Sequence, residues 1–315
     1  MISVVCTLFE NHFHFGLAAL TNSLCRQGFK GSVYAGYRGA LPKWCSSAKP
    51  DSSLNWPGAS IYHATEHVTI NFLPVDTAFH FTNYKPAFML QLLNGAAKHA
   101  DAIMYFDPDI VINCNWSFFE DWASHGVALV HEIVTNDLPD THPVRMQWKK
   151  IIESNNREIT HKVDSYINGG FCGVTKENIS FLATWNEFIN IGIKEYNADI
   201  TKIWSFNKAH PFCFLDQDAL NITAMCCDCP ISEMGPDGMD FIHGGWTMAH
   251  AVGSPKPWKK KFIASAFKGI PPSIADKEFW KNANGPVSTY STGYAKIKML
   301  SMQTAAFMGR FYRRY

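Results

Sequence analysis

The sequence lacks any apolar run of the roughly 18 residues that a membrane-spanning helix needs. It also lacks a basic segment before its first apolar residues, so the opening MISVVCTLFENHF is predicted to form a strand and not a secretory signal. A large net charge is absent too, because 28 Lys and Arg residues offset 27 Asp and Glu residues to leave +1. This balance argues against nucleic acid as a partner, since it provides no general field for polyanions.

An even cysteine framework is lacking as well. Nine cysteines are scattered along the chain, and several lie in predicted strands, where a thiol acts as a small hydrophobic group. This usage is typical of a reducing compartment and predicts a cytoplasmic protein. The cluster Cys226-Cys227-Asp228-Cys229 contains a Cys-x-x-Cys spacing suited to zinc or redox chemistry, but no second matching pair lies nearby.

The order of the elements predicts the fold class. The 315 residues show no internal repeat and suffice for a large α/β core. Strands are predicted over residues 2–9, 32–37 and 67–73, with a helix over 11–27 and an irregular segment over 39–66. A strand-helix-strand opening indicates a parallel, Rossmann-like sheet, in which ligands bind beyond the carboxyl ends of the strands.

The alternation continues beyond residue 80. The patterns predict a helix over 83–99, strands over 102–106, 126–132 and 165–175, helices over 176–192 and 214–225, and a final helix over 295–315. Segment 136–162 is polar and expected to be partly helical, and the glycine-rich segment 241–258 is expected to be a loop.

Two carboxylates one residue apart follow the strand predicted over 102–106, in the sequence Asp107-Pro108-Asp109. Alternate side chains of a strand share a face, and unpaired carboxylates at the end of a buried strand are costly. The proline removes a backbone donor, so the ladder is expected to end there. Two interpretations stay open from these residues alone: an ordinary Asp-Pro-Asp turn, or a site for a divalent cation that prefers oxygen ligands.

Four segments are informative together: Asp107-Pro108-Asp109, Asn168-Gly169-Gly170, Asp216-Gln217-Asp218, and the stretch from His250 through Gly253 to Lys256-Pro257-Trp258. In this order they resemble glycosyltransferase family 8, the retaining enzymes that include glycogenin and the bacterial lipopolysaccharide galactosyl- and glucosyltransferases. The resemblance covers about residues 1–260. Its most specific part is the His-x-x-Gly-x-x-Lys-Pro-Trp pattern.

The resemblance implies a GT-A fold over residues 1–265, a Rossmann-like mixed sheet flanked by helices. Residues 1–115 would form the nucleotide-sugar half and residues 116–265 the acceptor half, followed by a C-terminal extension over 266–315. It further implies a retaining hexosyltransferase of polysaccharide or lipopolysaccharide biosynthesis. The donor would be a nucleotide sugar, in the first place a UDP-hexose, the acceptor a glycan or glycolipid, and the cofactor Mn²⁺, with Mg²⁺ as the alternative.

The same resemblance makes Asp107, Asp109 and His250 the metal ligands, and two carboxylates with an imidazole are a donor set that suits Mn²⁺. His243, in the preceding His-Gly-Gly, competes with His250, but the spacing to Lys256-Pro257-Trp258 favours His250. The other donor-binding positions implied are Thr7, Leu8, Asn11, Pro108, Asn168, Gly169, Gly253 and Lys256.

The catalytic residues implied by the resemblance are Gln217, Asp216 and Lys85. Gln217 would lie under the anomeric carbon, and because an amide is a poor nucleophile, same-face attack is favoured over a covalent intermediate. Asp216 would bind donor-sugar hydroxyls. Lys85 would approach the metal-binding aspartates, or else be a solvated lysine in the first turn of a helix. Asp218 is alternatively a first-turn acid that the helix dipole favours.

Two other classes of function stay open. A nucleotidyltransferase acting on sugar nucleotides would be expected to carry a glycine-rich phosphate loop after the first strand, which residues 7–15 lack. A catalytically inactive carbohydrate-binding protein could keep the fold, but the metal, phosphate and sugar positions are all retained.

The C-terminal segment 295–315 also has two interpretations. It is either a final helix packed on the body or a basic amphipathic helix on an anionic membrane surface, which would place the protein at the inner face of the membrane. The residues concerned are Met299, Met302, Phe307, Arg310, Phe311, Tyr312, Arg313 and Arg314.

Overall fold

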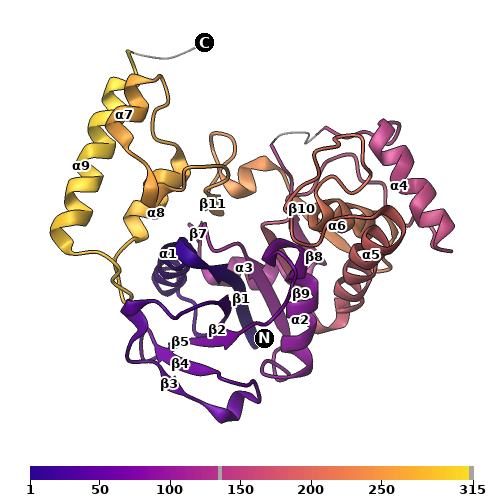
Figure 1. The fold of residues 1–315 in the computed structure, drawn as a ribbon, viewed down its shortest axis with the longest axis horizontal. Coiled ribbons are helices and arrows are strands. Elements are labelled where there is room, and N and C mark those ends of the chain that lie inside the picture. Colours follow the sequence, from indigo (N-terminus) through magenta and orange to yellow (C-terminus); the bar gives the residue numbers. More distant parts are fainter. Residues whose placement is uncertain (134–136, 312–315) are drawn as a thin grey trace.

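The computed structural model describes residues 1–133 and 137–311 (Figure 1). Over these residues a nine-stranded sheet has the order β10-β8-β9-β6-β1-β2-β5-β4-β3, and a two-stranded sheet pairs β11 with β7. The strands are β1 (Ser3–Glu10), β2 (Gly31–Arg38), β3 (Lys49–Pro50), β4 (Ser60–His63), β5 (Val68–Pro74), β6 (Ala102–Phe106), β7 (Ile110–Ile112), β8 (Val127–Val130), β9 (Phe171–Thr175), β10 (Ile231–Met234) and β11 (Met248–His250).

Strand direction brings the functional end of the sheet together. β1 is parallel to β2 and β6, and β9 is antiparallel to both β6 and β8. The carboxyl ends of β1, β6 and β8 therefore lie at the same edge, next to the beginning of β9. The predicted parallel opening is confirmed, and so is the mixed α/β fold class.

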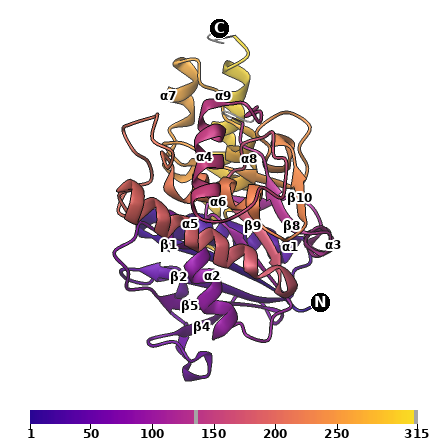
Figure 2. The ribbon, with the colours of Figure 1, turned by 90° about the vertical axis from the view of Figure 1, so that its right-hand side faces the viewer.

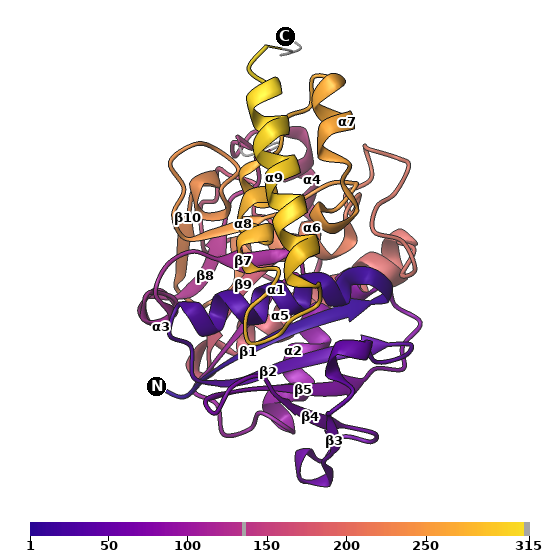
Figure 3. The ribbon, with the colours of Figure 1, turned by 90° about the vertical axis from the view of Figure 1, so that its left-hand side faces the viewer.

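Helices cover both faces of the large sheet (Figures 2 and 3). They are α1 (His14–Arg26), α2 (Lys85–Asn94), α3 (Trp116–Ser124), α4 (Pro143–Ser154), α5 (Ser180–Tyr196), α6 (Leu215–Cys226), α7 (Phe262–Phe267), α8 (Ile274–Asn282) and α9 (Thr292–Met308). Alternation along β1 sorts the core: Val5 and Phe9 join a cluster with α1 and α3, whereas Cys6 and Leu8 join one with α2, α5 and α6.

Several boundaries differ from the prediction for local reasons. Segment 39–66 contains two short strands, β3 at the edge of the sheet and β4 between β3 and β5, whose pattern was obscured by the many turn residues around them. The helix predicted over 83–99 ends at Asn94, with Gly95 at its C-cap. The predicted loop over 241–258 contains β11, a strand too short to show alternation. Residues 134–136 and the basic end of the chain (Tyr312, Arg313 and Arg314) lie outside the described residues.

The helices after residue 260 share a hydrophobic cluster with the body. Trp258, Phe279, Trp280 and Met302 pack in one cluster with Ala19 of α1, together with residues of β7 and β11. The cluster crosses residue 265, so the proposed extension 266–315 is docked on the body and not detached from it. In the described part of the chain, no helix combines the length and the apolar character needed to cross a membrane.

Candidate active site

A cavity of about 570 Å³ opens at the carboxyl edge of β1, β6 and β8. It is lined mainly by the ends of β1 and β6, the turn before β9, the first turn of α6 and the residues after β11. Its lining includes the predicted positions Leu8, Lys85, Asp107, Pro108, Asp109, Asn168, Gly169, Asp216, Gln217, His250, Gly253 and Lys256. Residues far apart in the sequence thus meet at the edge where the fold class places ligands.

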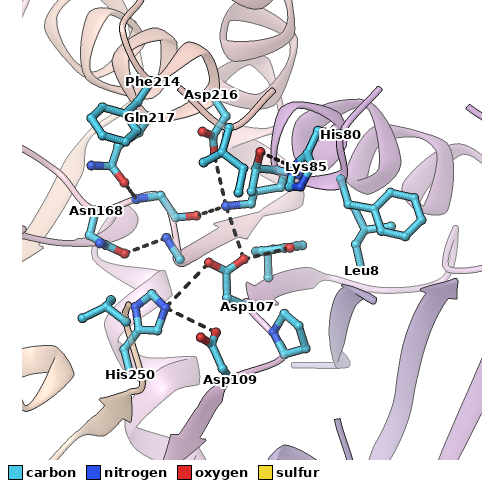
Figure 4. A pocket seen from close by; sticks show the side chains of 18 of the residues that line it. Leu8, His80, Lys85, Asp107, Asp109, Asn168, Phe214, Asp216, Gln217 and His250 are labelled. Atoms are coloured by element: carbon cyan, nitrogen blue, oxygen red, sulfur yellow. Dashed lines mark hydrogen bonds and ion pairs between the residues drawn. The ribbon is translucent and has the colours of Figure 1, made fainter. Parts of the chain in front are cut away.

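Asp107, Asp109 and His250 form one group at the floor of this cavity (Figure 4). One ligand atom from each lies within 4.8 Å of the others. His250 Nε2 is 3.8 Å from Asp107 Oδ2 and 3.4 Å from Asp109 Oδ1. Among residues 1–133 and 137–311, this is the only group of three or more His, Cys, Asp or Glu side chains arranged to hold a metal ion.

Backbone pairing of β7 with β11 brings His250 to the aspartates. The two strands are antiparallel, with His250 opposite Ile110, and the Ala251 N–H donates to the Asp109 carbonyl at 3.1 Å. His243, the competing candidate, is exposed and outside the group. The spacing argument that favoured His250 therefore agrees with the geometry.

Two lysines occupy the outer oxygens of the aspartates. Lys85 Nζ lies 3.3 Å from Asp107 Oδ1, and Lys256 Nζ lies 2.5 Å from Asp109 Oδ2. Each carboxylate therefore directs its other oxygen toward His250. Burial raises the pKa of Asp109, but His250 and Lys256 outweigh burial and hold that pKa below its usual range.

Lys85 is the most deeply placed charge in the site. Its side chain is 2 % exposed, and its ammonium also contacts Asp216 Oδ2 at 3.0 Å and donates to the Gly169 carbonyl at 2.8 Å. Burial lowers the pKa of Lys85, but Asp107 and Asp216 outweigh burial and raise it above its ordinary value. The alternative of a solvated first-turn lysine is therefore wrong.

The charges and donor atoms fit a divalent cation. The ion-paired groups of the site are three carboxylates, Asp107, Asp109 and Asp216, and two ammonium groups, Lys85 and Lys256. Glu10 and Glu132 also line the cavity, so carboxylates outnumber cations and a divalent cation would offset negative charge there. The ligand atoms that face one another are two carboxylate oxygens and an imidazole nitrogen, a donor set compatible with Mn²⁺ or Mg²⁺.

The turn before β9 joins the metal group to α6. Asn168 Oδ1 accepts from the Gly170 N–H at 2.7 Å, while the Asn168 amide donates to Glu132 Oε2 at 2.6 Å. Gln217 Oε1 accepts from the Gly169 N–H at 2.9 Å. These bonds fix the orientation of both amides, so their remaining donors and acceptors face the cavity in defined positions.

The first-strand tip places its predicted residues differently. Leu8 lines the cavity, whereas Thr7 is fully buried in the sheet and Asn11 is exposed with a left-handed φ of 51°. Glu10 and Phe13 of the same segment line the cavity instead.

Further residues of the site were missed from the sequence. Tyr105 donates to Asp107 Oδ1 at 3.1 Å, and Tyr166 donates to Asp218 Oδ1 at 2.7 Å. Tyr105 shares a strand face with Asp107, so the two-residue period could have identified it. Glu132 follows β8 at the same edge and was detectable by the rule applied to Asp107. Phe214 carried no comparable signal.

The Cys226-Cys229 segment does not form a second site. Cys226, Cys227 and Cys229 are buried, and no metal-binding group that includes them occurs among the described residues. Burial raises the pKa of the Cys226 and Cys227 thiols to about 12. These thiols are therefore unreactive core groups.

Replacing Gly170 by alanine should disturb the metal group specifically. A Cβ at position 170 would lie 2.5 Å from His250 Cε1 and 2.8 Å from Asn168 Oδ1. Because the imidazole must shift, we expect Mn²⁺ affinity to fall about 10- to 100-fold, the range typical of altered support around a ligand. Titration calorimetry with Mn²⁺ measures this. Gly293→Ala is the control, since a Cβ there meets nothing within 4 Å, and equal affinities for both variants would contradict the expectation.

Asp218 should make stability depend on pH. Burial raises the pKa of Asp218 to about 7, so between pH 4 and 7 the unfolded chain releases a proton that the folded chain keeps, and stability falls as pH rises. Asparagine resembles the neutral acid, because its Oδ1 can accept from the Phe214 N–H and its amide can donate to Tyr166. We expect Asp218→Asn to be near-neutral at pH 5 and to gain on the order of 2 kcal/mol over wild type at pH 8. Urea denaturation at both pH values measures the difference, and a gain of equal size at both would rule out this origin.

The comparisons with known proteins support the fold. No family model matches the sequence, and no curated protein matches it either. The apo structure of the bifunctional glycosyltransferase WbbM matches 95 % of this chain with a TM-score of 0.56 and 14 % identity, and the chain covers 52 % of WbbM, about half its length. The galactosyltransferase LgtC, solved with donor and acceptor sugar analogs, matches 94 % of this chain and is itself 99 % covered, with a TM-score of 0.54 and 14 % identity.

An active-site mutant of LgtC matches similarly, with 92 % of this chain and 98 % of LgtC covered, a TM-score of 0.53 and 12 % identity. At these identities the likeness concerns the fold. The chain therefore has the glycosyltransferase fold of the GT-A type, with an Asp-Asp-His group at the ligand-binding edge of its sheet.

Proposed function

We propose that this protein is a retaining hexosyltransferase that uses a nucleotide sugar, in the first place a UDP-hexose, and Mn²⁺. Its acceptor would be a glycan or glycolipid of polysaccharide or lipopolysaccharide biosynthesis. The observation that carries the proposal is the Asp107-Asp109-His250 group, whose outer oxygens are held by Lys85 and Lys256 at the ligand-binding edge of this fold.

Each residue has a role that its contacts support. Asp107, Asp109 and His250 would hold the cation, which supplies electrostatic stabilisation of the leaving diphosphate. Lys256 lies three residues after the left-handed Gly253 (φ 78°). Its ammonium would contact the same phosphates after leaving its ion pair with Asp109. Asn168 and Asp216 would orient sugar hydroxyls.

Gln217 would act at the reacting carbon. Its amide is fixed by the Gly169 N–H, and it lies in the first turn of α6, beside Asp216 and above the metal group (Figure 4). A held amide oxygen can stabilise positive charge at the anomeric carbon while the acceptor attacks from the face that the diphosphate leaves. This arrangement supports same-face attack, because a neutral amide is a weak nucleophile.

A donor panel tests the proposal. Purified protein with Mn²⁺ is mixed with a set of UDP-hexoses, and released UDP is measured together with the thermal shift caused by each donor. We expect one donor to be hydrolysed slowly without acceptor and to stabilise the protein only when Mn²⁺ is present. No release and no shift with any UDP-sugar would falsify the enzyme assignment.

We also propose that α9 contacts an anionic membrane surface. Met302 and Ala305 pack inward, whereas Ile297, Leu300 and Phe307 are exposed on the opposite side. We expect Leu300→Gln with Phe307→Gln to reduce co-sedimentation with anionic liposomes severalfold without lowering the melting temperature. Truncation after residue 295 would be a poorer test, because it also removes the two buried side chains. Unchanged pelleting of the double variant would contradict membrane contact by this helix.

A further inference from the structure

The segment between α5 and α6, residues 197–214, exposes aromatic side chains that have no part in the proposed metal or donor sites. Phe206 is 81 % exposed and Trp204 is 45 % exposed, and their rings form an edge-to-face pair with centroids 5.0 Å apart. Ile203 and Phe214, on either side of this pair in the sequence, are also exposed. Contiguous exposed apolar groups of this kind mark a contact surface more often than single exposed residues do.

This segment is a held structure and not a free loop. Asn83, itself buried, donates its amide to the carbonyls of Ile200 at 3.0 Å and Lys202 at 2.9 Å. Between the two aromatic residues, the Ser205 N–H donates to the Cys213 carbonyl at 2.6 Å and ties the pair to the returning part of the segment. The exposed rings are therefore presented from a base that both ends of the segment fix.

The return path of the segment is anchored as well. Trp148 donates its indole N–H to the Pro211 carbonyl at 2.7 Å, His210 Nε2 lies 2.8 Å from the Tyr196 carbonyl, and Phe212 is buried. Phe212 therefore anchors the segment in the core, whereas Trp204 and Phe206 stay exposed to solvent. Exposure at Trp204 and Phe206 is a property of this fixed arrangement.

Two residues of the segment reach the candidate active site. Ile203 and Phe214 line the same cavity as Asp216 and Gln217, and Figure 4 shows the Phe214 ring beside the Gln217 amide. Trp204 directly follows the lining residue Ile203 but does not itself line the cavity, so the aromatic pair lies beside the cavity on this side. A ligand that extends out of the cavity on this side would meet Trp204 and Phe206.

The chemistry of the pair suits a sugar ring. Flat rings cover the apolar C–H face of a pyranose, and among residues 1–133 and 137–311 the indole N–H of Trp204 has no hydrogen-bond partner, so it can donate to a hydroxyl. Two lysines flank the pair in the sequence: Lys202 is paired with Asp199 at 2.9 Å, whereas Lys208 is exposed and has no ion pair among the described residues. The two rings with the free indole donor are the feature that suits a sugar, and a single unpaired lysine beside them is far from the basic cluster that binds anionic head groups.

We propose that Trp204 and Phe206 form a second acceptor subsite, which binds a sugar ring of the acceptor glycan beyond the ring that receives the hexose. This inference rests on the proposed function, because the chain that leaves the cavity here is its acceptor. Binding energy from such a distant ring would select longer acceptors and hold the attacking hydroxyl in place.

A glycan array probed with the full chain in the presence of UDP and Mn²⁺ tests the subsite. We expect wild-type protein to bind a subset of di- and longer oligosaccharides, and Trp204→Ala with Phe206→Ala to weaken that binding about tenfold or more. Phe206→Tyr should retain binding, because it keeps the ring. Phe311→Ala, which removes another exposed ring on the C-terminal side of the molecule, is the matched control and should bind as wild type does.

Separate readouts keep the two proposals apart. UDP-dependent thermal shift and acceptor-free UDP-sugar hydrolysis should be unchanged in the double variant, because neither ring lies among the metal or diphosphate groups. Glycan binding equal to wild type in the double variant would overturn the subsite, and so would the absence of any glycan binding by wild type. If the double variant lost liposome pelleting but bound glycans as wild type does, the pair would be a lipid contact, and the subsite proposal would be overturned. Loss of UDP binding in wild type would instead count against the proposed function.

Discussion

Asp109→Asn should abolish Mn²⁺-dependent turnover of the UDP-sugar, with kcat/KM about 10³-fold lower. The substitution keeps the shape of a side chain that is 5 % exposed but removes the anionic oxygen nearest His250 Nε2. It also leaves the Lys256 ammonium without its carboxylate partner. Electron paramagnetic resonance of free Mn²⁺ measures the loss of binding, and UDP release measures the loss of turnover.

Asp276 provides a matched control for this result. Asp276 is also a buried aspartate paired with a lysine, since its Oδ2 lies 2.8 Å from Lys260 Nζ, but it caps α8 and does not line the cavity. Asp276→Asn should cost stability and leave Mn²⁺ binding intact. Wild-type Mn²⁺ affinity in Asp109→Asn would remove Asp109 from the ligand set.

Lys85→Met should lower the free energy of unfolding by about 3–5 kcal/mol at pH 8, the cost expected for leaving buried charges without a partner. Lys85 lies between Asp107 and Asp216, and without its ammonium the deeply buried Asp216 carboxylate loses its cationic partner. Urea denaturation followed by tryptophan fluorescence measures the change. Activity should be lost as well, since the same bonds position the Gly169 turn.

The stability lost in Lys85→Met should depend on pH, because its partner Asp216 can take up a proton. Burial already raises the pKa of Asp216 above its usual value, with Lys85 opposing, so removing Lys85 raises it further. The folded state of the variant then takes up a proton as pH falls, and we expect the destabilisation to be smaller at pH 5 than at pH 8. Lys256→Met should cost less, because that side chain is 17 % exposed and has one carboxylate partner. Equal losses in the two variants would refute the bridging role of Lys85.

Local patterns were enough to predict where the two aspartates lie. Asp107 and Asp109 follow an apolar run whose strand character is unambiguous, and the proline between them ends that strand, so both lie in the turn between β6 and β7. The resemblance added His250 and Lys256 by spacing. What a pattern could not reveal was the partner of each charge, because Lys85 meets Asp107 and Asp216 only after α2, β6 and α6 have packed.

The missed features have a common physical origin. β11 is three residues long, and its strand character comes from pairing with β7 and not from its own sequence. Nothing in the sequence around Phe214 marks it as a site residue. Its place in the cavity comes from the tertiary packing of the 197–214 segment, which is anchored to Asn83. Thr7 was predicted to bind the donor, but it is fully buried in β1. The side chains of a strand point alternately to its two faces, so a position next to the cavity-lining Leu8 can be buried.

The cation site cannot form during synthesis until β11 has been made and has paired with β7, because β11 carries His250. Lys256 follows Asp109 by 147 positions, which at about 5–20 residues per second corresponds to roughly 7–30 s on the ribosome. During that interval the nascent chain holds its aspartates without His250 or Lys256. The cation site would therefore be completed only after about four fifths of the polypeptide has been made, so prematurely terminated chains would lack a complete cation site even where their sheet has formed.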